Sequence, residues 1–462
     1  MPLRLPSRAP HPGYLLYLHN ALRPRTELVS GRSIASCPKR GGLDSGIRYN
    51  DWFPTALTIS MDLACDDHGN RTRLSRLAQN GVKVWGPERV YISEEVRLDR
   101  IAAGAVLMNA TITGATTFIG AGAQIGTSGS ARIHEAQIAP SVVLGAGSYE
   151  NCVLLSRSKT RGFAELRQGT VLEECAEIGH NVGLKNTVLM VGAVAGSSIN
   201  FCDVLLAGGS SRSDHSEVGS GVVHFNFDPR GDKFGSLMGD ATGCLLQSRR
   251  IFLGGNSGIV APVHLEFGTV VAAGSILRRD VSENQLSWGD PTGLSGEYDL
   301  DRYFDLSRKF CTTAKLIGNL HALRAWYRNI RQACAEPDSR LLYAAADQEF
   351  DRHIKRRTHE LAKVVGKLDK SLSKPSRSER DRMFEEQHRR LLANCEHIDS
   401  LLRCEDYADT PAVLLAEYTE NRRVREHVES VHNLSAEASA TAVRWLREIA
   451  SLPYLQMRAL FS

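Results

Sequence analysis

Aliphatic residues recur at every sixth position through the middle of this 462-residue chain. One run places five of them six residues apart without a gap: Leu253, Ile259, Leu265, Val271 and Leu277. Such a period is typical of short strands that each point one aliphatic side chain into an interior, with small residues where the chain turns. Because few segments of this region show helical periodicity, the repeat predicts a mainly β structure.

The same period appears in three earlier runs, which are Ile119 to Ile125, Ile138 to Leu144, and Ile178 through Leu184 to Met190. Three hexads of this kind form one triangular coil. Coils stack on one another, and the backbone hydrogen bonds between them follow the pattern of a parallel sheet. The alternative is a set of ordinary buried strands. Four runs in register favour a parallel β-helix of hexapeptide repeats.

Composition divides the chain into three regions. Residues 1–72 are rich in Pro, Arg, Ser and Gly, so we expect partial disorder there, with a short ordered piece near Trp52 and Phe53. Residues 73–297 begin with a short helix over 73–82 and carry the repeat. Residues 298–462 contain little glycine, and their apolar spacing predicts an α-helical C-terminal domain with helices over 303–332, 338–372, 376–403, 411–433 and 435–450.

Charge and composition argue against several kinds of partner. The net charge of +4 is too small over this length to indicate nucleic acid. No stretch reaches the roughly 18 apolar residues of a membrane span, and the N-terminus lacks the apolar run of a signal peptide. The ten cysteines form no C-x-x-C pair and show no metal spacing. We therefore expect a cytoplasmic protein with reduced thiols, no bound metal and no membrane contact.

Four blocks of sequence resemble the C-terminal acetyltransferase domain of the bifunctional N-acetylglucosamine-1-phosphate uridyltransferase / glucosamine-1-phosphate acetyltransferase family. They are LSRLAQNGVKVWGPERVYI, ELRQGTVLEECAEIGHNVGLKNTVL, VGSGVVHFNFDPRGDK and IFLGGNSGIVAPVHLEFGTVVAAGSILRRDV, all within residues 74–281. The last block is common to hexapeptide transferases, and the middle two are more specific. The resemblance implies a left-handed β-helix, a homotrimer, and acetyl-CoA in the groove between neighbouring subunits.

The resemblance also assigns residues to an acceptor site and a donor groove. Arg167 and Lys185 match the arginine and lysine that hold the sugar phosphate, and their separation of 18 residues places them on one face, one coil apart. That spacing suits a clamp on an anion. Asn226 matches the sugar-binding asparagine, and Lys233 matches a nearby basic residue with a one-residue offset. The residues implied for the acyl-CoA groove are Ser220, Gly255 and Ala273.

The chain departs from the family where the chemistry is expected. The family's catalytic histidine falls on Ser197, a neighbouring tyrosine becomes Asn200, and the tyrosine after the sugar-binding asparagine becomes Phe227. Six extra residues, one hexad, lie between Asp203 and Asn226. The residues before the first helix contain no Gly-rich phosphate loop, so the nucleotidyltransferase half is missing and no pyrophosphorylase activity is expected.

Two histidines, His215 and His224, are candidates for a replaced base. His215 lies between Asp214 and Glu217 in the polar inserted segment, where a carboxylate can orient the ring and keep its pKa near neutral. The alternative for His215 is a surface turn residue. His224 lies two residues before Asn226 and is a candidate for catalysis or binding. Together with His180, these residues suggest the zinc site of γ-class carbonic anhydrases, but the close histidine pair of that family is absent.

Basic residues outside the repeat are assigned smaller roles. Arg212 and Arg230 are candidates to join Lys233 in one basic patch. The charged segments HIKRR (353–357) and RRVREH (422–427) are expected to form solvated helix faces. The C-terminal helices are expected to cap the open end of the β-helix, hold the oligomer together or bind a protein partner.

The sequence therefore predicts a hexapeptide acyltransferase that moves an acetyl or related acyl group from CoA to a sugar phosphate or nucleotide sugar, in amino-sugar metabolism. His215 would be the base, Arg167 and Lys185 would hold phosphate, and Asn226 would hold the sugar. The alternative is a protein that has lost catalysis and uses the β-helix to bind a nucleotide sugar or to assemble a complex.

Overall fold

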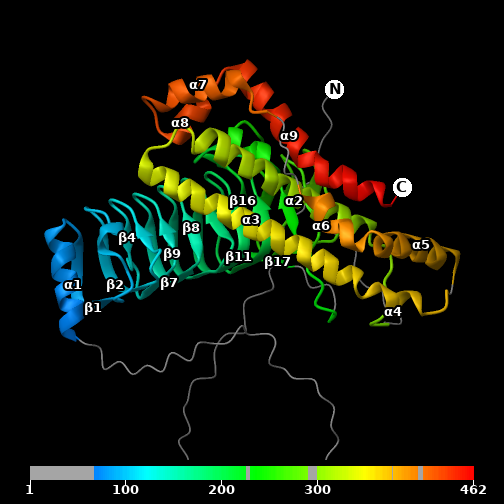
Figure 1. Cartoon of the computed structure of the whole chain (residues 1–462), viewed down its shortest axis with the longest axis horizontal. Coiled ribbons are helices and arrows are strands. Elements are labelled where there is room, and N and C mark those ends of the chain that lie inside the picture. The colour runs from blue at the N-terminus through cyan, green and yellow to red at the C-terminus, as the bar shows by residue number, and fades with distance from the viewer. Residues whose placement is uncertain (1–66, 225–228, 290–298, 377, 404–408, 462) are drawn as a thin grey trace, which may run out of the picture. The chain divides into compact units, whose positions relative to one another are not determined.

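The computed structural model describes residues 67–224, 229–289, 299–376, 378–403 and 409–461. The N-terminal segment expected over 1–72, with Trp52 and Phe53, lies almost wholly outside these residues. From β1 to β24 the chain winds into a left-handed parallel β-solenoid with three faces (Figure 1). The aliphatic residues of the six-residue repeat fill its interior, since the run from Leu253 to Leu277 is at most 2% exposed. The predicted β-helix is confirmed.

Six strands bend around a corner and contribute to more than one face: β1 (Lys83–Ile92), β2 (Val106–Thr113), β7 (Val143–Glu150), β9 (Lys159–Leu166), β11 (Glu177–Leu189) and β13 (Ile199–Leu206). β13 forms parts of the second and third faces, β11 parts of all three, and the other four parts of the first and second. The other strands of the first face are β4 (Gln124–Ile125), β12 (Val194–Ala195), β16 (Glu217–Val218), β19 (Phe252–Leu253), β22 (Val270–Val271) and β24 (Leu286–Ser287).

The second face adds β5 (Ala131–His134), β17 (Gly221–His224), β20 (Ser257–Val260) and β23 (Ile276–Leu277). The third face consists of β3 (Phe118–Ile119), β6 (Gln137–Ile138), β8 (Cys152–Leu154), β10 (Thr170–Leu172), β18 (Ser236–Met238) and β21 (His264–Leu265), with the ends of β11 and β13. Each corner is named below by the two faces that it joins. Side chains at one corner on successive coils stack along the solenoid axis, about 4.8 Å apart.

Tight corners explain the glycine and asparagine content of the repeat. Gly126 has a φ of +80°, and a Cβ there would lie 1.8 Å from the carbonyl oxygen of Met108. Asn181, at the corner between the first and second faces, adopts a φ of +57°. Asparagine tolerates this left-handed region better than bulkier residues do.

Helix α1 (Asp67–Gln79) covers the first coil with its buried Leu74 and Leu77. It begins before the predicted start at residue 73, because Asn70 joins the helix to β1: its Nδ2 donates to the Val90 carbonyl at 2.9 Å, and its Oδ1 accepts from the Ile92 amide. The helix ends just before Gly81, as the sequence predicts.

The inserted hexad forms a small antiparallel hairpin of β14 (Gly209–Ser211) and β15 (Asp214–His215). It projects at the third–first corner, between β13 and β16, so the solenoid register resumes after it: Val194 pairs with Glu217. The extra residues therefore leave the stacking of the coils intact.

The C-terminal region is helical, as predicted, with α2 (Ser307–Ala325), α3 (Pro337–Val365), α4 (Leu368–Leu372), α5 (Glu379–Ala393), α6 (Ile398–Leu402), α7 (Ala412–Arg422), α8 (His427–His432) and α9 (Ala436–Ala459). A π-helical turn, η4 (Trp326–Arg331), extends α2, and short 3-10 turns are η2 (Leu98–Arg100), η3 (Ala241–Leu245) and η5 (Cys395–His397). The helix predicted over 435–450 runs on to Ala459, and Pro453 lies inside it.

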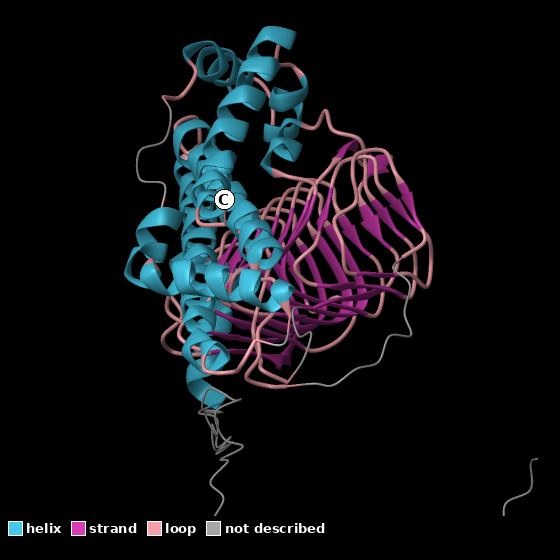
Figure 2. Cartoon of the chain, turned by 90° about the vertical axis from the view of Figure 1, so that its right-hand side faces the viewer, coloured by secondary structure: helices cyan, strands magenta, loops and turns pink. Residues whose placement is uncertain are grey.

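Helix α3 packs along the third face of the solenoid, against β6, β8 and β10 (Figures 1 and 2). The segment HIKRR on this helix is not the solvated face that the sequence suggested. His353 and Arg357 are buried, and Arg357 forms an ion pair of 3.0 Å with the buried Asp203 of β13. In the other charged segment, Arg423 is exposed whereas His427 is buried.

A second buried polar contact joins the solenoid to the helices. Arg331, in η4, lies 3.5 Å from Glu173 and also pairs with Glu174. The hydroxyl of Tyr327 donates to Glu173 at 2.6 Å. Burial raises the pKa of Glu173, and Arg331 opposes this effect. The helices are therefore fixed to the side of the solenoid by paired charges as well as by apolar packing.

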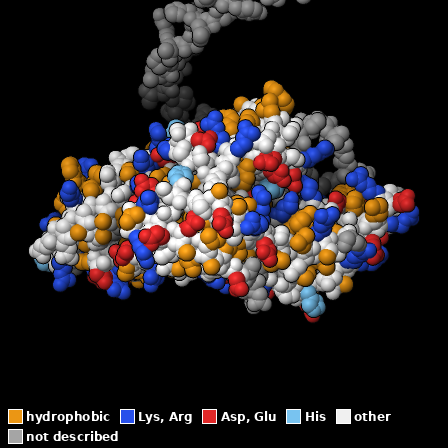
Figure 3. Space-filling view, turned by 90° about the horizontal axis from the view of Figure 1, so that it is seen from above, with side chains coloured by type: hydrophobic (Ala, Val, Ile, Leu, Met, Phe, Trp, Pro, Cys, Tyr) orange, Lys and Arg blue, Asp and Glu red, His pale blue; other side chains and the backbone are white. Residues whose placement is uncertain are grey.

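The surface over α7, α8 and α9 carries interspersed basic and acidic side chains (Figure 3). Among the described residues, no helix is long and apolar enough to cross a membrane.

Candidate functional site

The second–third corner carries basic side chains on three of four successive coils. The Arg167 amide donates to the Leu184 carbonyl at 3.0 Å, so Arg167 and Lys185 lie one coil apart, as predicted. Lys185 pairs with Cys202, and His224 takes the same position on β17. We call Arg167, Lys185 and His224 at this corner the anion ladder.

Charge at the anion ladder is concentrated and partly shielded from water. The pKa of Lys185 is lowered, first by burial and then by the positive charges of Arg356, Arg167 and Lys233. The pKa of His224 is also lowered by burial, although nearby Asp203 opposes this effect. A bound phosphate would relieve the repulsion among these groups, so the corner is electrostatically suited to an anion.

The structure describes some of the predicted acceptor-site residues and not others. Lys233 joins Arg167, Lys185 and His224, whereas Asn226 and Phe227 lie outside the described residues. Arg356 is an addition that sequence reasoning missed. It belongs to HIKRR, which was assigned to solvent because no sequence pattern indicates that α3 docks on the solenoid.

The other two arginines of the suggested basic patch are engaged elsewhere. Arg230 lies over the Tyr303 ring, 4.5 Å from its centre. Arg212 belongs to the hairpin at the third–first corner and pairs with Glu177 at 2.6 Å. The suggested patch therefore reduces to Lys233 at the anion ladder.

Small residues stack at the neighbouring first–second corner. Ser220, Gly255 and Ala273 lie there on three successive coils, and all are at least partly exposed. The Ser220 hydroxyl accepts from the Asn256 amide at 2.7 Å. A row without bulky side chains lets an extended ligand lie close to the backbone, so these residues fit the pantetheine arm of an acyl-CoA.

A histidine–serine pair lies earlier on this same corner. The Ser197 hydroxyl is 3.0 Å from Nδ1 of His180, which belongs to the preceding coil. The His180 side chain is exposed. Because Nδ1 contacts Ser197, proton transfer to a substrate is assigned to Nε2. Sequence reasoning considered His180 only as a metal ligand, but the one-coil separation from Ser197 was a signal that could have linked the two.

His215 lies at the third–first corner. Within one chain it is therefore away from both the anion ladder and the His180–Ser197 pair. Its Nδ1 contacts the Arg212 carbonyl at 2.8 Å, and Nε2 is 3.8 Å from Glu217. Asp214 does not orient the ring, because it accepts from the Ser210 hydroxyl at 2.9 Å and lies 3.7 Å from Arg250.

The three histidines considered for zinc occupy three different corners of the solenoid: His180 at the first–second, His224 at the second–third and His215 at the third–first. A closed metal site needs ligands that converge on one point. One chain therefore does not gather these three side chains around an ion. Within the described ranges, no group of three or more His, Cys, Asp or Glu side chains is placed to hold a metal.

Comparison with known proteins supports the resemblance seen in the sequence. The Bifunctional protein GlmU of Pseudomonas entomophila is 31% identical over 212 residues, which are 46% of this chain and 42% of that protein. GlmU of Acinetobacter baylyi is 29% identical over 233 residues, and GlmU of Streptococcus suis 27% over 213 residues. The β-solenoid is similar to the acetyltransferase region of GlmU.

The chain spans less than half the length of the GlmU proteins that it matches. No protein-family model matches it. Among solved structures, the polysialic acid O-acetyltransferase OatWY covers 46% of the chain at 15% identity, with a TM-score of 0.14, a likeness too slight to bear on function.

Two departures from the GlmU-like pattern lie on or beside the second face. Ser197, where the resemblance implies a catalytic histidine, is the partner of His180. Asn200 is exposed on the second face, between Gly183 and Val222 of the adjacent coils. An imidazole from the preceding coil therefore lies beside Ser197, with its Nδ1 3.0 Å from the serine hydroxyl.

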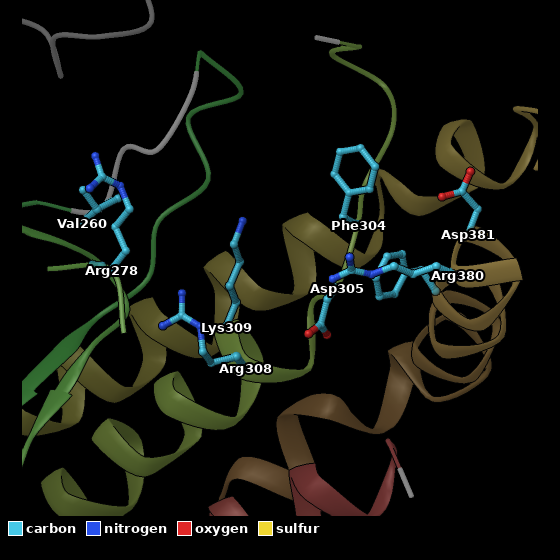
Figure 4. A pocket seen from close by; sticks show the side chains of 10 residues that line it. Val260, Arg278, Phe304, Asp305, Arg308, Lys309, Arg380 and Asp381 are labelled. Atoms are coloured by element: carbon cyan, nitrogen blue, oxygen red, sulfur yellow. The ribbon is translucent and has the colours of Figure 1, made fainter. Parts of the chain in front are cut away.

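A cavity of about 580 Å³ lies between the last coils and the helices (Figure 4). Arg278 and Val260 line its solenoid side, Arg308 and Lys309 of α2 line its middle, and Phe304 and Arg380 lie opposite the solenoid. The remaining lining residues are Ala261, Asp305, Asp381 and Phe384.

Proposed function

We propose that this protein transfers an acetyl or related acyl group from CoA to an amino or hydroxyl group of a sugar phosphate or nucleotide sugar. One observation carries the proposal: the second face lies between the anion ladder and the corner of small residues. An acceptor held by its phosphate on Arg167 and Lys185 would extend across this face toward the His180–Ser197 pair. Similarity to GlmU supports acyl transfer as the type of reaction.

The structure suggests His180 as the base. Bound acyl-CoA would supply an activated thioester along Ser220, Gly255 and Ala273. The acceptor amine attacks the acyl carbon, forming a carbon–nitrogen bond as the carbon–sulfur bond breaks, and CoA leaves as the thiolate. Nε2 of His180 takes the amine proton, while Ser197 holds the ring at Nδ1. His224, at the anion ladder, would contact the phosphate end of the acceptor.

The resemblance to the acetyltransferase family adds a homotrimer to the proposal. In a homotrimer the donor would lie between neighbouring solenoids, so a residue of a second chain could complete the site. The predicted base His215 would reach the acceptor only from such a neighbour, because in its own chain it lies at another corner. Binding of the sugar by Asn226 stays a prediction, as does recruitment of a protein partner by the C-terminal helices.

The test is an incubation of the purified full chain with acetyl-CoA and glucosamine-1-phosphate, with product detected by mass spectrometry. N-acetylated product is expected. Arg167→Ala or Lys185→Ala should raise KM for the acceptor by about tenfold or more, since each removes a charged contact to phosphate. Arg89→Ala is the matched control, because Arg89 is exposed and pairs with its neighbour Glu88.

Absence of product would reject this acceptor. If a nucleotide sugar then bound saturably and no acyl product formed with it either, the protein would be a binding or scaffold protein rather than a transferase.

A further inference from the structure

The anion ladder continues beyond His224 into the cavity of Figure 4. His224 pairs with Val260, and Ile259 pairs with Leu277, which places Val260 beside Arg278 on the following coil. Val260 and Arg278 line the cavity. Three inter-strand spacings separate Lys185 from Val260, or about 14 Å. One continuous row of positions therefore connects the proposed phosphate clamp to the cavity.

The lining of the cavity is predominantly basic. Four of its residues carry positive charge and two carry negative charge: Arg278, Arg308, Lys309 and Arg380 against Asp305 and Asp381. One of these acids is already paired, since Asp381 lies 3.2 Å from Arg302. Arginine-rich walls favour phosphate, because guanidinium groups bind its oxygens in a fixed geometry.

An aromatic surface adjoins the basic groups. Phe304 is 56% exposed, and its ring meets that of Phe384 edge to face, with 6.4 Å between the ring centres. Arg380 lies over the Phe384 ring, 5.5 Å from its centre. An exposed ring beside cations offers a planar heterocycle a face to stack on, while its phosphates reach the arginines. The floor of Val260 and Ala261 is apolar.

We infer that this cavity binds the nucleoside diphosphate end of a nucleotide-linked sugar, whose sugar lies on the second face of the solenoid. A sugar monophosphate held by its phosphate at Lys185 would not reach the cavity, which is about 14 Å away. A sugar joined through a diphosphate to a nucleoside can place the diphosphate on the arginines of the cavity and extend the sugar back along the row. This choice between the two acceptor classes rests on the proposed function only for the fate of the sugar; binding of a nucleotide stands on the cavity alone.

Isothermal titration of the full chain with UDP and with ADP tests the inference, since stacking on phenylalanine does not select the base. Pyrophosphate and glucosamine-1-phosphate are titrated alongside. At least one nucleotide should bind at least tenfold more tightly than pyrophosphate. Arg380→Ala and Phe304→Ala should each weaken nucleotide binding about tenfold, through loss of a charged contact and of stacking area. Arg382→Ala, an exposed change on the same helix, is the control and should leave binding unchanged.

The outcomes separate the two proposals. If neither nucleotide binds, or if the two variants bind as the wild type does, the inference is overturned. Equal binding of pyrophosphate and nucleotide, insensitive to Phe304→Ala, would also overturn it and leave a simple anion site. Nucleotide binding that needs Arg380 and Phe304, in a chain that transfers no acyl group, would support the cavity site while rejecting the transferase.

Discussion

At the residue scale, the closest approach to catalytic chemistry is the contact between His180 and Ser197. The sequence shows a serine in the place of a catalytic histidine, which by itself suggests lost activity. The coil geometry changes that interpretation, because residues one coil apart at the same corner lie side by side. A base supplied by the preceding coil can serve the same stretch of the second face.

Replacing His180 provides the residue-scale prediction. His180→Gln retains a polar group beside Ser197 but removes the base, so kcat for acyl transfer should fall by about 10²–10⁴, with KM for the sugar phosphate little changed. Ser197→Ala should lower kcat less, because it leaves the imidazole in place. Steady-state kinetics between pH 5.5 and 9 measure both effects. His215→Gln is the comparison: loss of activity there, with His180→Gln active, would return the role to His215.

At the scale of elements, the sequence predicted the solenoid well and the helix packing poorly. The run from Leu253 to Leu277 gives the coil register directly, because one inward aliphatic residue per hexad is a local requirement. The placement of the helical region depends on contacts between distant segments, such as Arg357 of α3 with Asp203 and Tyr327 of η4 with Glu173. A charged helical segment is usually solvated, so nothing local marked HIKRR as part of an interface.

The pair of Arg357 and Asp203 provides a prediction about how α3 is held. Burial alone would raise the pKa of Asp203. Arg357 and His353 lower it by more than burial raises it, so the pKa lies below its ordinary value and the carboxylate is kept ionised. Arg357→Met leaves that charge buried without its main partner and should reduce the free energy of unfolding by about 3–5 kcal/mol. Urea unfolding followed by circular dichroism measures the loss.

Two further variants distinguish the buried ion pair from a general effect of changing α3. Lys355→Met, on the exposed side of the same helix, should change stability by less than about 0.5 kcal/mol. The double variant Asp203→Asn with Arg357→Met should recover part of the lost free energy of unfolding, because it removes the unpaired buried carboxylate. A single Arg357→Met variant as stable as the wild type would show that this ion pair does not help to hold α3.

At the scale of the whole molecule, the helical domain and the solenoid form one packed body that buries several ionisable groups. The interior of the helical domain includes neutral histidines: Nε2 of His321 contacts the Leu402 carbonyl at 3.0 Å, and Nδ1 of His427 contacts the Tyr418 hydroxyl at 2.8 Å. Burial lowers the pKa of His321 to about 4 and that of His427 well below its ordinary value. These groups make the free energy of unfolding fall in mild acid. The aliphatic side chains inside the solenoid do not titrate and add no such dependence.

The sign of that sensitivity follows from proton binding. An unfolded histidine takes up a proton as the pH falls through about 6.5, but folded His321 does not until about pH 4. The unfolded chain therefore binds more protons between these values, and stability that is complete above pH 6.5 is lost progressively as the pH falls toward 4, by roughly 3 kcal/mol from this group. His321→Gln should flatten this dependence, while the exposed control His359→Gln should follow the wild type. Urea midpoints at intervals from pH 7.5 to 4.5 measure the slopes, and a His321→Gln slope equal to that of the wild type would assign the acid sensitivity to other groups.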